Sequence, residues 1–181
     1  MKIAIVGGGI FGIMSAIKLA KEHDVFLFEK NDDILKAASD VNQCRIHRGY
    51  HYPRSDETTI QTSKSHDSFL EEFSESIISG IDNYYCISKF DSYTKSKEYV
   101  KFCKRHNLEF TKVNLDLVDK NSIDICLKVK EYLFDHEILK KKCWEKLDKS
   151  GVTVYLNTIA DYEIYEKYDF IIISTYANIN S

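Results

Sequence analysis

The feature that most constrains this chain is a set of three spaced glycines between a predicted strand and a predicted helix. Residues 2–6 are an apolar run of strand length, and residues 10–21 have a helical pattern. Gly7, Gly9 and Gly12 fall between them with the spacing G-x-G-x-x-G. A glycine set in this context predicts a βαβ unit that binds a dinucleotide.

Each glycine has a separate physical role in such a unit. Gly7 permits the tight turn that leaves the strand, and Gly9 lets the backbone approach a pyrophosphate with no Cβ between them. Gly12 lets the helix pack closely on the sheet. The backbone N–H groups at Ile10 and Phe11 begin the helix, so they are expected to face the phosphates.

A second predicted strand, residues 24–29, ends in an acid at the usual distance from the glycines. The carboxylate of Glu29 is expected to accept hydrogen bonds from both ribose hydroxyls. An acid at this position disfavours the 2′-phosphate of NADP. Lys30 is a further candidate contact with the cofactor and the one argument for that phosphate. A glycine-rich turn in an unrelated α/β protein is the structural alternative.

Composition describes an ordinary globular protein. Of 181 residues, 44 % are hydrophobic and 29 % charged, and the net charge is −3, which gives no support for a nucleic-acid partner. The five cysteines are widely spaced and show no metal-binding pattern, so no metal is expected. They are expected to be reduced thiols of a cytoplasmic protein.

The N-terminus resembles a signal peptide, but its glycines and Lys18 interrupt the apolar run. No other stretch reaches the length of a membrane span, so no membrane partner is expected.

The remaining pattern predicts further helices and strands. Ser55 is expected to cap a helix that runs to Ile78, ends at Gly80 and buries four apolar residues: Ile60, Phe69, Phe73 and Ile77. Strands are expected at 83–88, 125–134, 152–156 and 169–175, and helices at 94–106 and 136–149. Residues 125–134 alternate as in a sheet that is wet on one face, whereas 169–175 is apolar throughout, as in the middle of a parallel sheet.

The predicted fold class is therefore α/β, a Rossmann-like nucleotide-binding domain with a parallel sheet, interrupted by part of an antiparallel substrate domain. The first domain is expected to comprise residues 1–80 and 136–181, and the second to begin within residues 81–135.

One segment between these parts is unusual. Residues 45–54, RIHRGYHYPR, contain three arginines, two histidines and two tyrosines, and no acid. A basic surface patch is the simplest interpretation of such a segment.

Three stretches make the chain resemble the FAD-dependent oxidoreductases of the D-amino-acid oxidase family. They are the glycine-containing segment 3–30, the segment ASDVNQCRIHRGYHYPRS at 38–55, and GVTVYLNT at 151–158 followed by YDFIIISTYANIN at 168–180. The likeness spans nearly the whole chain. It implies FAD as cofactor, and hydride transfer to the flavin from a C–N or C–O bond of a small amino acid, amine or hydroxy acid.

The resemblance also implies roles for individual residues. By matched position, Ser39 and Asn42 would contact the cofactor, as would Ser174 and Thr175 in the second dinucleotide motif. Tyr176 stands where the family commonly has glycine. Two further residues would lie near the flavin or the substrate as cofactor contacts and catalytic candidates: Arg45 and His47.

Arginine offers a permanent bidentate charge to an anionic flavin or a substrate carboxylate. An ion-pairing or surface role is the alternative for Arg45 and Arg54, and a structural histidine is the alternative for His47 and His51. Tyr50 and Tyr52 are expected to serve packing.

Members of this family are about twice as long, so the chain is expected to be a fragment or the product of a truncated gene. Two other functions remain open. The first is an NAD-dependent dehydrogenase, for which residues 7–29 alone would serve. The second is a catalytically inactive fragment, or a sensor, that binds the nucleotide.

Overall fold

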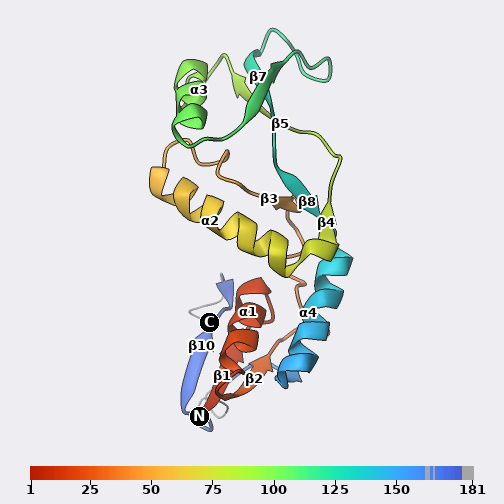
Figure 1. The fold of residues 1–181 in the computed structure, drawn as a ribbon. Coiled ribbons are helices and arrows are strands. Elements are labelled where there is room, and N and C mark those ends of the chain that lie inside the picture. The colour runs from red at the N-terminus through yellow and green to blue at the C-terminus, as the bar shows by residue number, and fades with distance from the viewer. Residues whose placement is uncertain (162–163, 165, 177–181) are drawn as a thin grey trace. The chain divides into compact units, whose positions relative to one another are not determined.

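The computed structural model describes residues 1–161, 164 and 166–176, which form two compact units (Figure 1). The first unit contains Met1–Gln43 and His136–Ser181, and the second contains Cys44–Asp135. The predicted α/β class is confirmed, with a parallel sheet in the first unit and antiparallel sheets in the second.

The first unit is built on a four-stranded parallel sheet in the order β10-β1-β2-β9. Its strands are β1 (Lys2–Val6), β2 (Asp24–Phe28), β9 (Thr153–Tyr155) and β10 (Phe170–Ile173). The two central strands, β1 and β2, are the most buried, because each has a neighbouring strand on both edges. Four of the five residues of β1 are buried, and three of the five residues of β2.

Two helices belong to this unit, and they contact each other: α1 (Ile10–Leu19) and α4 (His136–Ser150). The helix α1 buries Gly12, Ile13 and Ala16, which lie at helical spacing on one face. The face that α4 buries follows the same rule, with three residues at i, i+4 and i+8: Leu139, Cys143 and Leu147. Both predicted helices are confirmed within two residues of their expected ends.

The expected place of the strand 169–175 is wrong. It was predicted for the middle of a parallel sheet, but β10 lies at the edge of the described sheet, beside β1 alone. Phe170 and Ile173 are accordingly 61 % and 45 % exposed. An apolar run shows that a strand avoids water on both faces, yet it carries no information on how many neighbours the strand has.

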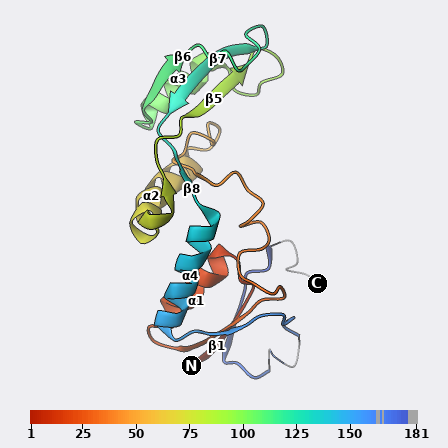
Figure 2. The same ribbon diagram turned by 90° about the vertical axis from the view of Figure 1, so that its right-hand side faces the viewer.

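The second unit holds two three-stranded antiparallel sheets. One has the order β3-β8-β4 (Figure 1) and the other β5-β7-β6 (Figure 2). Their strands are β3 (Arg45–Ile46), β4 (Ile77–Ile78), β5 (Asn83–Ser88), β6 (Phe110–Val113), β7 (Ile123–Val129) and β8 (Tyr132–Phe134). The unit also contains α2 (Asp56–Glu72), a short 3₁₀ helix (Ser74–Ser76) and α3 (Ser96–Arg105).

One face of the sheet β5-β7-β6 and the helix α3 enclose the core of this unit. The buried members come from both elements and from the loops beside them: Tyr50, Tyr99, Phe102, Cys103, Leu108, Leu127 and Val129. Tyr50 is fully buried, which agrees with its expected packing role.

The helix predicted from Ser55 to Ile78 is too long. Ser55 caps α2 as expected, with its Oγ accepting from the N–H of Thr58, but the helix ends at Glu72. The last turn contains acids and no basic residue, which opposes the helix dipole. Ile77 and Ile78 instead pair with β8 as a short strand, and Ile60 is exposed rather than buried.

The strand predicted over 125–134 is two strands in different sheets. The alternation ends at Val129, and the chain passes through Lys130 and Glu131 before β8 begins at Tyr132. Glu131 occupies an inward position of the alternating pattern, and a buried carboxylate needs partners that the flat sheet cannot supply.

By contacts within the chain, residues 44–80 group with 81–135 in the second unit; the domain boundaries expected from the sequence, at 80 and 136, stay a prediction. Among the described residues, no helix is both long and apolar enough to cross a membrane, and no group of three His, Cys, Asp or Glu side chains is arranged to hold a metal ion.

The chain leaves β10 through Tyr176, whose backbone lies in the left-handed region. Its φ is 54°, and its side chain is 82 % exposed. A residue with a Cβ is strained in that region by about 1–2 kcal/mol, whereas glycine is not. This is the position at which the resemblance places glycine, a residue that adopts this conformation without strain.

Replacing Tyr176 with glycine should therefore stabilise the first unit. We expect Tyr176→Gly to exceed Tyr176→Ala in unfolding free energy by about 1 kcal/mol, because alanine keeps the strained Cβ. Urea unfolding of the full-length protein measures both variants. Equal stability of the glycine and alanine variants would show that this conformation carries no strain.

Candidate functional site: a dinucleotide loop and a buried carboxylate

The loop between β1 and α1 can be built only with glycine at two positions. Gly7 has a φ of 110°, and a Cβ there would lie 2.6 Å from the carbonyl oxygen of Ser174. A Cβ at Gly12 would lie 1.9 Å from the carbonyl oxygen of Gly7, well inside van der Waals contact. The strand-to-helix turn is thus closed by backbone packed directly on backbone.

Gly9 is different, because the space around it is open. The nearest atom to a Cβ built there is the Oγ of Ser39, at 3.6 Å. Its backbone is extended and forms the N-cap of α1, with no side-chain cap. The loop therefore leaves room for a ligand atom to approach the backbone at the positive end of the helix dipole.

Glu29 is buried and anchors this loop. Its Oε2 accepts a hydrogen bond of 2.6 Å from the N–H of Gly8. Its Oε1 accepts two from Asn31, one from the backbone N–H at 2.9 Å and one from the side-chain Nδ2 at 2.6 Å. Since a carboxylate oxygen accepts about two hydrogen bonds, Oε2 has room for one hydroxyl donor in this arrangement. A second ribose hydroxyl needs the Asn31 amide to turn away.

Ser39 and Asn42 lie close to the helix start. The Oγ of Ser39 accepts the N–H of Ile10 at 3.3 Å, so the serine hydroxyl stands at the N-terminus of α1. Asn42 donates from Nδ2 to the carbonyl oxygens of Ser39, at 2.8 Å, and of Ala38. Phe11 and Lys30 are exposed to solvent.

The second motif meets the glycine loop. The N–H of Ser174 donates to the carbonyl oxygen of Val6 at 2.8 Å, and the backbone of Thr175 lies beside Gly7. The Oγ1 of Thr175 is buried with no hydrogen-bond partner among the described residues. A buried hydroxyl without a partner is costly, so this atom points to a polar ligand at the loop.

Arg45 and His47 belong to the second unit, where both lie at a buried carboxylate. The Nη2 of Arg45 donates to the Oε2 of Glu131 at 2.7 Å, and the guanidinium lies 4.6 Å from the ring centroid of Tyr85. The Nδ1 of His47 is 3.8 Å from Oε1, close enough for charge attraction but too long for a hydrogen bond. The ion-pairing role considered for Arg45 is what the structure shows.

Glu131 is saturated by these neighbours and two more. The N–H of Arg48 donates to Oε1 at 2.9 Å, and the hydroxyl of Tyr85 donates to Oε2 at 3.2 Å. Burial by itself raises the pKa of Glu131, but His47, the Arg48 N–H and the Arg45 guanidinium outweigh it. The net pKa lies below its ordinary value, and the side chain is ionised at neutral pH.

The other side chains of the segment 45–54 take simpler roles. His51 stacks on His47 with ring centroids 5.2 Å apart, and Tyr52 meets both rings edge-on. The guanidinium of Arg54 lies 5.3 Å from the ring centroid of Tyr93. Most of the cationic segment is therefore engaged with aromatic or acidic partners of its own unit.

Glu131 is the residue that the sequence analysis missed. The alternating pattern puts it on the same face as Leu127 and Val129, which is an inward position. An acid at an inward position predicts a buried partner of opposite charge, and the arginine-rich segment is the obvious source.

The comparisons with known proteins agree with the glycine loop. A family model described as FAD dependent oxidoreductase matches residues 2–160. The chain belongs to this family. The resemblance to the D-amino-acid oxidase type and the prediction of FAD are thereby confirmed, and the NAD alternative is disfavoured.

Individual proteins with related sequences show the same likeness. The chain is 27 % identical over 172 residues to the FAD-dependent monooxygenase kojA of Aspergillus flavus. The aligned region covers 91 % of this chain and 40 % of that protein. The chain therefore spans well under half of that relative.

Two solved structures share the fold. The glycine oxidase of Geobacillus kaustophilus matches with a TM-score of 0.66 at 15 % identity, covering 86 % of this chain and 46 % of that one. The L-alpha-glycerophosphate oxidase of Mycoplasma pneumoniae, with FAD bound, matches with a TM-score of 0.67 at 18 % identity, covering 87 % and 44 %.

The described residues fit the nucleotide end of FAD. The open backbone at Gly9 and the start of α1 suit the pyrophosphate, and the free capacity of Glu29 Oε2 suits a ribose hydroxyl. The unpartnered hydroxyl of Thr175 adds a polar contact at the same loop.

The buried pair of Glu131 and Arg45 should make the second unit sensitive to acid. The folded-state pKa of Glu131 is lowered, so its contribution is present above the ordinary pKa and is lost as the pH falls through the folded value. At neutral pH, Glu131→Gln should lower the free energy of unfolding by about 3 kcal/mol, because it leaves the charge of Arg45 without its partner. The variant should also lose less stability than the wild type on acidification from about pH 6 to about pH 3.

Urea unfolding of the full-length protein across this range measures both effects. Glu109→Gln is the matched control, because Glu109 forms a similar ion pair of 2.6 Å with Lys130 in the same unit, but both side chains are exposed. It should change stability little. Equal effects of the two substitutions would contradict the importance of the buried pair.

Proposed function

We propose that this chain is the FAD-binding part of an oxidoreductase that oxidises a C–N or C–O bond of a small amino acid, amine or hydroxy acid. The loop that carries the proposal is the turn from Gly7 to Gly12, held by the carboxylate of Glu29 on the N–H of Gly8. FAD, when bound, supplies the acceptor for a hydride, and the protein's own groups bind and orient it.

The roles of the first unit's residues follow from their positions. The N–H groups at the start of α1 would neutralise the pyrophosphate, and Glu29 would fix the ribose by a charge-assisted hydrogen bond. The hydroxyl of Ser39 stands at the same helix end, so it either turns to the phosphate or gives way to it. Ser174 and Thr175 would close the loop from the neighbouring strand.

For the second unit we propose that Arg45 and His47 act near the flavin or the substrate, as the family resemblance implies. The contact of Arg45 with Glu131 changes what this role can be. The guanidinium already forms an ion pair with Glu131, and one of its donors, Nε, is buried without a partner among the described residues. Arg45 is thus suited to orienting an anion through a remaining N–H rather than to supplying an unbalanced positive charge.

The name of the Aspergillus flavus relative supports a second candidate, a flavin-dependent monooxygenase. The two functions differ in the fate of molecular oxygen. An oxidase releases it as hydrogen peroxide, whereas a monooxygenase inserts one oxygen atom into the product. Mass spectrometry of the product formed under isotopically labelled oxygen, together with a peroxide assay, separates them in the full-length protein.

The proposed function is tested first by the visible spectrum of the purified full-length protein, since bound flavin absorbs in the visible range. A panel of amino acids, amines and hydroxy acids then follows under anaerobic conditions, where bleaching of the flavin reports substrate oxidation. A colourless protein that gains no absorbance with added FAD would contradict the proposal.

Glu29 gives the sharpest test of how the cofactor is held. Glu29→Gln should weaken FAD binding about 10-fold to 100-fold, because a charge-assisted hydrogen bond contributes about 1.5–3 kcal/mol. Dilution of the flavin-loaded protein followed by fluorescence of released FAD measures the change. Asp24→Asn, at the exposed opposite end of the same strand, is the matched control and should bind FAD normally. Full flavin retention by Glu29→Gln would make the assignment wrong.

Arg45 and Glu131 make a paired test of the flavin-facing proposal. Arg45→Met removes a positive charge and should lower the flavin's reduction potential, whereas Glu131→Gln removes a negative charge and should raise it. Both shifts should be on the order of tens of millivolts. Loss of structure would shift the reduction potentials of both variants in the same direction. Shifts of opposite sign would therefore be due to the two charges. Unchanged potentials with unchanged substrate affinity would contradict the role of Arg45 at the flavin.

A further inference from the structure

Two cysteines of the second unit face each other across neighbouring strands. Cys86 of β5 is paired directly with Cys126 of β7 in an antiparallel register, between the pairs Tyr85–Leu127 and Ile87–Ile125. Residues directly opposite in an antiparallel pair project from the same face of the sheet. The two thiols are therefore neighbours, although forty residues separate them in the chain.

This register meets the geometric requirement for a disulfide bond. Directly opposite residues in antiparallel strands have Cα atoms about 4.5–5.5 Å apart, which is inside the range of about 4.4–6.8 Å found across disulfides. Both thiols are free in the structure. Burial, and then the hydrogen bond with the Cys86 thiol, raise the pKa of Cys126 to about 12.

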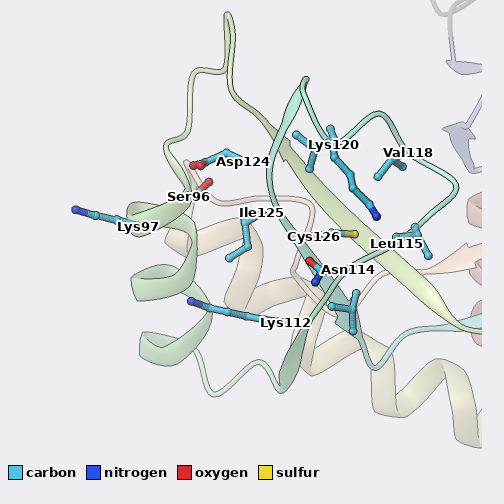
Figure 3. Close-up of a pocket in the computed structure, with 12 residues that line it drawn as sticks. Ser96, Lys97, Lys112, Asn114, Leu115, Val118, Lys120, Asp124, Ile125 and Cys126 are labelled. Atoms are coloured by element: carbon cyan, nitrogen blue, oxygen red, sulfur yellow. The ribbon is translucent and has the colours of Figure 1, made fainter.

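The pair lies on the sheet face opposite to the hydrophobic core. Tyr85 and Leu127 point to the core, so Cys86 and Cys126 point away from it. Cys126 is itself buried, but it lines a cavity of about 620 Å³ formed by β6, β7, the loop that joins them and the start of α3. Figure 3 shows its sulfur among the residues of that cavity. The cavity gives a small oxidant access to Cys126, and Cys86 is only half-buried.

The two remaining buried thiols offer a contrast. Cys103 and Cys143 are both completely buried on helices, where their neighbours are hydrophobic side chains. Neither has a thiol opposite it in the described sheets. The arrangement of Cys86 and Cys126 is a property of the register between β5 and β7, not of cysteine abundance.

We propose that Cys86 and Cys126 are a redox modification site, which a peroxide converts to a reversible disulfide within the chain. Cys86 is only half-buried, so its sulfur attacks the peroxide first and becomes a sulfenic acid, releasing one water. The sulfur of Cys126 then displaces the sulfenic hydroxyl as a second water, and the S–S bond forms. Together the two thiols lose two protons and two electrons, and hydrogen peroxide takes them up to form the two waters.

The crosslink falls next to the buried carboxylate of this unit. Tyr85 precedes Cys86, and its hydroxyl donates to Glu131. The strand that carries Cys126 leads directly to Glu131 through Val129 and Lys130. Oxidation would fix β5 to β7 one residue from Tyr85, which is a hydrogen-bond partner of Glu131. The inference concerns this unit alone and does not depend on the proposed function.

The test is peptide mapping of the full-length protein after brief treatment with hydrogen peroxide, at a few equivalents per chain. Trypsin separates the two cysteines, since Cys86 falls in the peptide 65–89 and Cys126 in the peptide 121–128. We expect these peptides joined, lighter than their sum by two hydrogens, and released by dithiothreitol. The protein should stay monomeric on a non-reducing gel, because the bond is within one chain.

Three variants assign the chemistry. Cys86→Ser and Cys126→Ser should each abolish the linked peptide, and Cys126→Ser should trap the sulfenic acid on Cys86, which dimedone labels. Cys86→Ser should give several-fold less label at Cys126, because that thiol is buried and protonated. Cys44→Ser, which removes the other half-buried thiol, is the matched control and should form the linked peptide normally.

The wild-type map alone decides the proposal, whatever the stability of the variants. Absence of the 65–89 to 121–128 link under oxidation, or its presence only in disulfide-linked dimers, overturns it. So does a link from either peptide to that of Cys44 in place of the expected one. Equal dimedone labelling of the two single variants overturns the assigned order of attack.

Discussion

The first unit depends on a contact between two backbone atoms, the Cα of Gly12 and the carbonyl oxygen of Gly7. No residue with a Cβ fits there, because that atom would lie 1.9 Å from the oxygen. The contact places α1 directly against the end of β1. The N-terminus of the helix then lies at the open space beside Gly9. Glu29 then fixes the loop from the next strand by accepting the N–H of Gly8. The cradle for a phosphate is thus shaped by the protein's own packing.

The second unit is organised around a buried charge rather than a close backbone contact. A carboxylate without exposure, such as that of Glu131, is tolerable only when several donors surround it. Arg45, Tyr85 and the N–H of Arg48 supply them, and together they tie β3, β5 and the loop after β3 to one point. The same arrangement explains why the long alternating stretch divides into β7 and β8.

The glycine loop and the buried carboxylate differ in what they reveal about function. The dinucleotide loop is a property of one short segment, and its chemistry can be stated from that segment. The cationic segment 45–54 cannot be interpreted from its own composition, because its charges meet partners that lie far away in the chain. Arg45 finds Glu131, and Arg54 finds the ring of Tyr93. Charge counted in a sequence window is therefore not charge presented to a ligand.

The sequence by itself determined the βαβ unit, the roles of Gly7 and Gly12, the cap at Ser55, and the α/β class, because these follow from local spacing and backbone geometry. It also carried the family likeness. Tertiary structure decided where β10 lies in its sheet, where the helix α2 ends, and which residue neutralises Arg45. It likewise brought Cys86 opposite Cys126. Strand order, register and burial depend on contacts between distant segments, and the energy of such contacts is not encoded in any one window of the chain.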